Sequence, residues 1–279
     1  MNNLPLYSQI TIWFIYGSTA LCFLLVLCGV LRQRIMHTLP AVPLFPGSSF
    51  PHPGAYIYTG IMMLIFMLSS VISIKSPEMK SHEPLELIAS MVIQIALYLP
   101  CVCMYFILPR RNVPASPLLT KIWWVCKALL ILWGCSAILH VCRFDAWLIE
   151  VTQCPPVQDV VDRMLKGPDF EKGMMAFMAI LVAPVTEECF FRGFIYNILK
   201  RWNGRILATL ASALLFASVH GSLMQMMPLT IFGIVQCFAY EKSRSLWLPI
   251  VIHTVFNACS CLLILIAPEL LDLYDKSSF

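Results

Sequence analysis

Long apolar runs separated by short polar segments dominate the pattern of residues along the chain. A helix that crosses the hydrocarbon core of a bilayer needs about 20 mostly apolar residues. The pattern therefore predicts about eight membrane-spanning helices, of which the sixth is the shortest and can be tilted or incomplete. The predicted spans cover residues 9–31, 55–74, 85–108, 120–142, 174–200, 205–220, 223–240 and 246–267.

These stretches predict an all-α fold, a polytopic bundle of transmembrane helices. An open sheet exposed to lipid would leave its backbone groups unpaired, and the strand alternation of an outer-membrane barrel is absent. Residues 1–8 contain no Lys or Arg, and the apolar run that follows them is longer than the hydrophobic region of a signal peptide. We therefore expect the first stretch to remain as a span.

The composition supports a membrane protein and excludes several other classes. Of the 279 residues, 59% are hydrophobic and only 12% are charged, whereas soluble domains carry about 25% charged residues. This excludes a soluble enzyme, a disordered tail and a fibrous repeat. The net charge of +4 comes from scattered basic residues, so we expect no nucleic-acid partner. Most of the 12 cysteines lie within apolar runs, where cysteine behaves as a small hydrophobic residue.

Basic residues in the predicted loops favour one orientation, because Lys and Arg concentrate on the cytoplasmic side of a membrane. If all eight stretches cross, both termini lie outside and the more basic loops face the cytoplasm. Lys127, in the fourth stretch but near its end, can reach the interface or face a cleft. The basic residues on the cytoplasmic side are then Arg32, Arg34, Arg110, Arg111, Lys121, Lys200, Arg201, Arg205, Lys242 and Arg244.

A change in polarity within the predicted spans divides the chain into parts. Residues 1–142 form apolar transmembrane helices with no role that the sequence indicates. Residues 143–173 are polar and read as a connecting loop. Residues 174–267 contain carboxylates, an arginine and imidazoles at membrane depth, and they form the expected catalytic core. Residues 268–279 are a C-terminal tail.

Ionisable residues in the fifth stretch are the first candidates for chemistry. Each costs about 2.5–3.5 kcal/mol to insert at membrane depth, so a functional role is the default hypothesis. Glu188 and Arg192 are four residues apart with the acid first, the better order for a helical ion pair. Glu187 points about 100° away around the helix and stays available. A helix kinked or restarted at Pro184 would place both acids in its first turn, where anionic groups are favoured.

Two later stretches add imidazoles and an amide. His220 ends the sixth stretch, and His253 and Asn257 lie one turn apart in the eighth, on one face. A glutamate supported by histidine can deprotonate water, and imidazole and amide donors can stabilise an oxyanion. Structural alternatives stay open: the pair Glu188–Arg192 or Asn257 can join helices, and His140 is expected to be a hydrogen-bonded helix contact.

The depths of the two histidines pose a problem for this hypothesis. His220 lies about 22 Å along the sixth stretch, whereas His253 lies about 10 Å along the eighth. Both stretches run in the same direction if every stretch crosses the bilayer. The histidines then lie at different depths unless the sixth helix is tilted, short or displaced.

The three segments together resemble the CPBP family of intramembrane proteases, which includes the type II CAAX prenyl endopeptidases and bacteriocin-processing relatives. The family pattern reads here as Glu187-Glu188-x-x-x-Arg192, Phe216-x-x-x-His220 and His253-x-x-x-Asn257, in that order. The resemblance covers about residues 174–267 and extends to the contexts Phe191-Arg192-Gly193 and Ser245-Leu-Trp-Leu-Pro249.

The resemblance implies a role for each matched residue. Glu187 would activate the attacking water with His220 as its partner. His253 and Asn257 would hold the oxyanion, and Glu188, Arg192 and Phe216 would support the site. No cofactor is then required. Zinc is the alternative, held by Glu187, His220 and His253, although the chain lacks a His-Glu-x-x-His signature.

The expected function is therefore an intramembrane endopeptidase that hydrolyses a membrane-associated peptide or protein of CAAX or leader type. Its expected partners are that substrate and the lipid bilayer, and the sequence indicates no oligomeric state. Two other classes stay open. The same Glu and His residues can form the relay of a proton- or ion-coupled transporter, although the halves show no repeat. A non-catalytic membrane scaffold is the third class.

Overall fold

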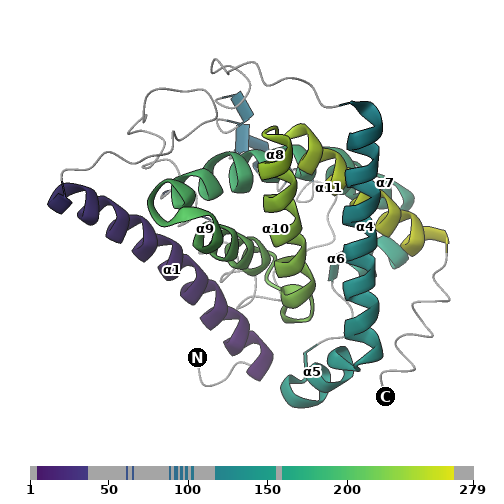
Figure 1. Ribbon diagram of the computed structural model, residues 1–279. Coiled ribbons are helices and arrows are strands. Elements are labelled where there is room, and N and C mark those ends of the chain that lie inside the picture. Colours follow the sequence, from purple (N-terminus) through teal and green to yellow (C-terminus); the bar gives the residue numbers. More distant parts are fainter. Residues whose placement is uncertain are drawn as a thin grey trace.

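The computed structural model describes residues 5–36, 117–154 and 159–266, together with a few positions between 61 and 103. Within this part of the chain all regular structure is helical (Figure 1), which confirms the predicted class. The elements are α1 (Leu6–Met36), α4 (Leu118–Val141), α5 (Phe144–Thr152), α6 (Asp159–Lys166), α7 (Asp169–Phe177), the π-helical η2 (Met178–Val182), α8 (Ala183–Glu188), the π-helical η3 (Cys189–Tyr196), α9 (Asn197–Val219), α10 (Leu223–Ser243) and α11 (Trp247–Ile266).

Four segments of the described chain are long and apolar enough to cross a membrane: Leu6–Gly29, Leu118–Val141, Asp169–Val219 and Trp247–Ile266. They correspond to the first, the fourth, the joined fifth and sixth, and the eighth predicted stretches. The seventh stretch forms α10, which is not among the four. The predicted spans 55–74 and 85–108, apart from a few positions, and the tail 268–279 lie outside the described residues. The count of eight is not confirmed and stays a prediction.

The segment Asp169–Val219 bends sharply at Gly204. Its 51 residues would extend about 76 Å as one straight helix, far beyond the roughly 30 Å hydrocarbon core. Gly204 has φ 77° and ψ 178°, a combination that only glycine adopts readily. The chain turns back on itself there (Figure 1), in the gap between the predicted stretches 174–200 and 205–220.

Residues 143–173 are not the loop that the sequence predicted. Their described part forms the short helices α5, α6 and α7. The acidic residues that suggested a loop include Asp145, Asp169 and Glu171, which lie in the first turns of α5 and α7, where the helix dipole favours negative charge. Apolar residues such as Leu148 and Met164 are buried, so these helices also have a core-facing side.

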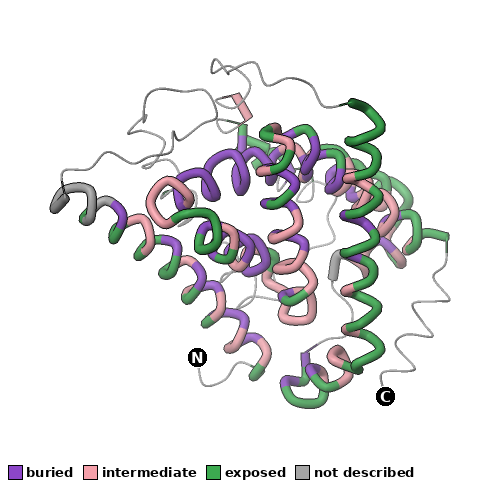
Figure 2. Tube along the Cα trace, viewed as in Figure 1, coloured by how far each residue is buried: buried purple, intermediate pink, exposed green. Residues whose placement is uncertain are grey.

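Helix α9 lies at the centre of the bundle and packs against α1 and α10, while α4 packs against α10 and α11. Figure 2 shows the buried residues concentrated in the middle, with exposed residues along the outer faces of α1 and α4. These outer faces carry large apolar side chains such as Trp13, Leu130 and Val141. A broad exposed apolar surface of this kind is suited to contact with lipid.

Helix α1 is part of the core through its contact with α9. The hydroxyl of Ser18 donates to Oγ of Ser218 at 2.8 Å, and Cys22 is buried against the same helix. Ser218 lies two residues before His220. Helix α1, in the N-terminal region for which the sequence indicates no role, therefore supports the end of α9 that carries this histidine.

Candidate active site

The two adjacent acids lie inside a continuous helical stretch, not at a helix start. Pro184 is near the beginning of α8, but Val182 before it is also helical, with φ −81° and ψ −52°. Glu187 and Glu188 are the last residues of α8, and no acid lies in its first turn. The first-turn prediction is wrong because the preceding π-helical turns of η2 let the helix continue through a proline that lacks an N–H.

Glu188 is the centre of a buried hydrogen-bond network. Its Oε1 accepts from Nη1 of Arg192 at 2.9 Å, from Nε2 of Gln236 at 3.1 Å and from Nδ1 of His253 at 2.9 Å. Glu188 and Arg192 are both completely buried. One carboxylate oxygen thus joins the helical stretch of α8 and η3 to α10 and α11.

The guanidinium of Arg192 is held on several sides. Besides Glu188, its Nη2 donates to the carbonyl oxygen of Gly233 at 3.3 Å, and it lies 4.6 Å from the centre of the Phe216 ring. A Cβ atom on Gly233 would lie 2.8 Å from Cα of Ala213. Glycine is therefore required where α9 and α10 approach each other, and this approach brings the Gly233 carbonyl to Arg192.

Glu187 faces the two histidines. Its Oε2 lies 4.0 Å from Nε2 of His220 and 4.0 Å from Nε2 of His253. This oxygen is buried and has no hydrogen-bond partner among the described residues. The structure thus separates the two acids as the helical geometry predicted: Glu188 is paired with Arg192, and Glu187 is not.

The hydrogen bonds of the imidazoles assign their tautomers. Nδ1 of His220 lies 2.8 Å from the carbonyl oxygen of Phe216, and Nδ1 of His253 lies 2.9 Å from the carboxylate of Glu188. Both partners can only accept, so each Nδ1 carries a hydrogen and donates. In each neutral ring Nε2 therefore has a lone pair, and both lone pairs lie beside Oε2 of Glu187.

The depth difference expected between the two histidines does not arise. His220 lies just beyond the end of α9, and His253 lies in the second turn of α11, yet both approach the same carboxylate oxygen. The prediction assumed two straight spans in the same direction. Since both rings reach one carboxylate oxygen, α9 and α11 are displaced or tilted relative to each other, as the sequence left open for the sixth stretch.

Asn257 lies on the same helix as His253 and bonds to a different element. Its Nδ2 donates to the carbonyl oxygen of Ala179 in η2 at 2.7 Å. This is the interhelical contact that the sequence left open as an alternative. The second hydrogen of the same amide is not used in that bond, and the oxyanion role of Asn257 stays a prediction.

Aromatic rings form the walls around the histidines. The Phe216 ring lies 4.8 Å from that of His220 and 6.2 Å from that of His253. The Phe232 ring lies 4.8 Å from that of His253. Phe216 therefore lies between both imidazoles and Arg192, and the low polarity of these walls strengthens the electrostatic interactions inside the site.

Gln236 belongs to the site and was missed by the sequence analysis. It is completely buried, and its Nε2 donates both to Glu188 and to the carbonyl oxygen of Pro249, the latter at 2.8 Å. The sequence feature that could have indicated it is the presence of an amide side chain within the apolar stretch 223–240. A polar side chain at such a position usually finds a partner across a helix interface.

The distances are longer than those of a bound zinc ion, and the zinc alternative stays a prediction. Two ligands of one tetrahedral zinc ion lie roughly 3.4 Å apart, whereas Oε2 of Glu187 lies 4.0 Å from each Nε2. No group of three or more His, Cys, Asp or Glu side chains among the described residues is placed to hold a metal ion.

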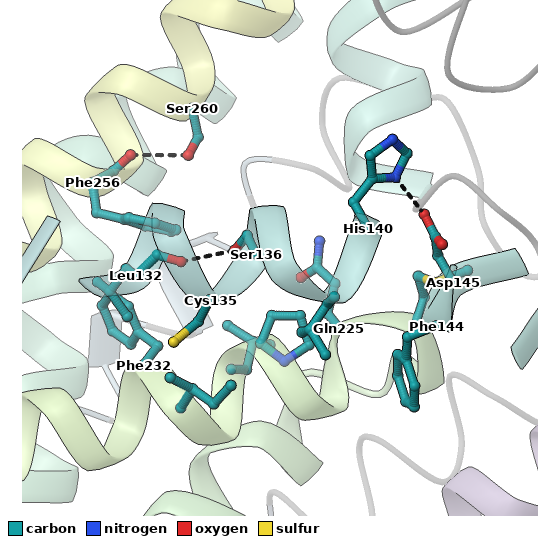
Figure 3. A pocket seen from close by; sticks show the side chains of 15 residues that line it. Leu132, Cys135, Ser136, His140, Phe144, Asp145, Gln225, Phe232, Phe256 and Ser260 are labelled. Atoms are coloured by element: carbon teal, nitrogen blue, oxygen red, sulfur yellow. Dashed lines mark hydrogen bonds and ion pairs between the residues drawn. The ribbon is translucent and has the colours of Figure 1, made fainter. Parts of the chain in front are cut away.

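A cavity of about 380 Å³ adjoins the site, between α4, α10 and α11. Figure 3 shows Phe232 and Phe256 at one end and the hydrogen-bonded pair His140–Asp145 at the other, with Nδ1 of His140 2.9 Å from Oδ2 of Asp145. Phe232 lines this cavity and also contacts His253. His140 has the hydrogen bond expected for a structural contact.

Comparison with known proteins finds a described family that is similar to the part of the chain carrying this site. Residues 170–259 match the family described as "Type II CAAX prenyl endopeptidase Rce1-like". The Bacillus subtilis (strain 168) protein named "Putative membrane peptidase YdiL" is 30% identical over 84 residues, which are 30% of this chain and 34% of that protein. The Escherichia coli protein named "Uncharacterized 24.3 kDa protein" is 25% identical over 166 residues, 57% of this chain and 72% of that protein.

These matches confirm the resemblance inferred from the three motifs, and Glu187, His220 and His253 all lie within residues 170–259. The chain spans about a third of the length of the Bacillus subtilis relative. No solved structure matches this chain. Together with the four long apolar helices, the matches support an integral membrane protein in which residues 170–259 are similar to this family.

Proposed function

We propose that the protein is an intramembrane endopeptidase in which Glu187 activates water. The observation that carries this proposal is the position of Oε2 of Glu187, 4.0 Å from Nε2 of both His220 and His253. A separation beyond 3.5 Å between polar atoms suits a bridging water. A water between them can donate to the carboxylate of Glu187 and to Nε2 of His220, and it lies beside a carboxylate that can take its proton.

Charge balance supports the same assignment. Glu187 and Glu188 carry two negative charges, and Arg192 supplies one positive charge. One additional proton, held among Glu187, His220 and His253, makes the buried cluster neutral, and neutrality avoids the large cost of an uncompensated charge away from water. The cluster thus both accepts a proton from water and holds one to donate.

The hydrolytic step follows from these positions. The water oxygen attacks the carbonyl carbon of the scissile peptide bond, and its proton passes to Glu187. The protonated Nε2 of His253, held in place through Nδ1 by Glu188, donates to the developing oxyanion, and the second amide hydrogen of Asn257 can add to it. When the C–N bond breaks, Glu187 returns the proton to the leaving nitrogen, which gives a carboxylic acid and an amine.

The proposed substrate is a membrane-associated peptide or protein, of CAAX or leader type. The cavity beside His253 is lined mainly by apolar side chains, among them Leu132, Leu229 and Phe256. It can accept an apolar side chain or a lipid group next to the scissile bond. The family match favours the CAAX type, whereas the apolar lining alone is compatible with both.

The test uses the full chain, purified in lipid nanodiscs and incubated with prenylated C-terminal peptides and with leader peptides, with cleavage read by mass spectrometry. We expect Glu187→Gln to reduce cleavage by about 10²–10⁴-fold, since the amide cannot act as a base. The exposed Glu150 on α5 provides the matched control, and Glu150→Gln should retain full cleavage.

Undiminished cleavage by Glu187→Gln would refute the assignment of the base. Proton or ion flux across liposomes that depends on Glu187, without cleavage of either peptide class, would support the transporter alternative instead. Folded yield and melting temperature, measured on the same preparations, separate a loss of chemistry from a loss of structure.

A further inference from the structure

A second cavity, of about 430 Å³, lies along the same α4–α10–α11 interface but towards the opposite end of α4. It shares no lining residue with the cavity of Figure 3. Its charged lining comprises four cations, Lys127, Arg205, Lys242 and Arg244, and one acid, Glu241. This excess of positive charge is not used by the proposed catalysis.

Two of these cations make cation–π contacts with the indole ring of Trp124. Nζ of Lys127, from α4, lies 5.3 Å from the Trp124 ring, and Nζ of Lys242, from α10, lies 5.7 Å from it. Cation–π contacts of this kind attract each ammonium to the ring face. Two like charges from different helices therefore contact one ring of the cavity lining.

The single acid of the lining is already engaged. Glu241 pairs with Lys200 and, at 3.4 Å, with Arg205. Lys127, Lys242 and Arg244 have no acidic partner among the described residues. The cavity thus presents cations that an external anion can neutralise.

The remaining wall is apolar and reaches the outer surface. Ile131 and Phe238 line it and are 43% and 64% exposed, on helices whose outer faces carry other large apolar side chains. Val235 and Ile252 line its inner end. A small soluble anion gains nothing from such a wall, whereas an acyl chain is suited to it.

We infer that this cavity binds an anionic phospholipid, with the phosphate between Lys127, Lys242 and Arg244 and an acyl chain along Ile131 and Phe238. Arg205, Lys242 and Arg244 of its lining belong to the side that the distribution of Lys and Arg assigns to the cytoplasm. Basic pockets between transmembrane helices on that side are suited to acidic lipid headgroups. The inference is independent of the proposed protease activity.

A lipid in this cavity would contact α10 and α11, the helices that carry Gln236 and His253 of the candidate active site. Val235 and Ile252 immediately precede Gln236 and His253 in the sequence, and both line the cavity. A lipid bound there packs against both α10 and α11, and we expect it to stabilise their contact.

The experiment measures lipid binding to the full chain in detergent, by native mass spectrometry and by melting temperature, with dioleoyl phosphatidylglycerol and dioleoyl phosphatidylcholine as the probes. We expect retention of phosphatidylglycerol and a higher melting temperature with it than with phosphatidylcholine. Lys127→Gln and Lys242→Gln should each weaken phosphatidylglycerol binding by about fivefold, the effect of one basic residue near an anionic lipid surface.

Lys121→Gln is the matched control, since Lys121 is an exposed lysine on the same helix as Lys127 but outside the cavity lining. An equal loss of binding in this control would overturn the specific site in favour of a general surface charge effect. Equal binding of the two lipids would also overturn it. Competition by glycerol 3-phosphate as strong as that by phosphatidylglycerol would show a phosphate site without a lipid chain and would refute the lipid assignment.

Discussion

Glu187 and Glu188 differ in their surroundings because neighbouring residues on a helix point about 100° apart. Glu188 points towards Arg192, Gln236 and His253 and accepts three hydrogen bonds. Glu187 points towards the Nε2 atoms of the two histidines. This difference predicts different effects for the same substitution at the two positions.

Glu188→Gln should lower the melting temperature as well as the activity. The substitution leaves the completely buried Arg192 without its counter-charge, and breaking a buried pair in this way costs about 3–5 kcal/mol. The free energy of unfolding should fall by an amount of that order, and Arg192→Gln should resemble it. Melting in detergent, followed by tryptophan fluorescence, is the measurement.

The double substitution Glu188→Gln with Arg192→Gln provides the control for this charge argument. Neither charge is then left alone, so part of the stability should return although the hydrogen bonds to Gln236 and His253 change. If the double variant melts no higher than either single variant, the loss of stability in the single variants does not come from an unpaired charge. Glu187→Gln, measured alongside, should melt near the wild-type temperature.

At the scale of elements, the bend at Gly204 determines how α9 returns to the site. Its first residues continue the helical stretch that carries the acids, and His220 follows its last residue. The φ of 77° and ψ of 178° would be strained in any residue with a Cβ atom.

Gly204→Ala should therefore destabilise the protein by about 1–3 kcal/mol, although an added Cβ meets no atom within 4 Å. The cause is backbone conformation alone, without a steric clash. Folded yield and melting temperature are the measurements. A variant as stable as the wild type would show that the chain does not bend at this residue.

Gly134 is the matched control because it is exposed in the interior of α4 and also has open space around its Cα. Its backbone is helical, so Gly134→Ala should leave stability unchanged or raise it by up to about 1 kcal/mol. Equal losses at both positions would point to a general sensitivity to substitution and not to the bend.

At the scale of the whole molecule, the number of membrane crossings determines which side of the bilayer each loop faces. The described residues contain four candidate spans, and the apolar pattern predicts about eight over the full chain. With eight crossings both termini lie outside, and the basic segment around Lys242 and Arg244 lies in the cytoplasm.

Reporter fusions after each predicted stretch test this topology, with enzymatic reporters that are active on only one side of the membrane. We expect the fusion after Ser243 to report the cytoplasm and the C-terminal fusion to report the outside. Six crossings or fewer would contradict the span assignment. In this topology the basic end of the α4–α10–α11 interface faces the anionic leaflet on the cytoplasmic side.

The sequence by itself determined the features that depend on neighbours along the chain. Length and apolarity of the runs predicted helices and membrane insertion, because both follow from a local solvent preference. The four-residue spacing of Glu188 and Arg192 predicted their ion pair, and the 100° step to Glu187 predicted that it would lie outside that pair. Three motifs in order were enough to indicate the family that residues 170–259 match.

Only the tertiary structure decided which distant residues meet. Glu188 and His253 are 65 positions apart, and their contact depends on how α8 packs against α11 after the chain has bent at Gly204. The same packing brings Gln236 to Glu188 and removes the depth difference that straight spans implied for His220 and His253. Local periodicity carries no information on such contacts, because they are set by the packing of helices that separate stretches of sequence form.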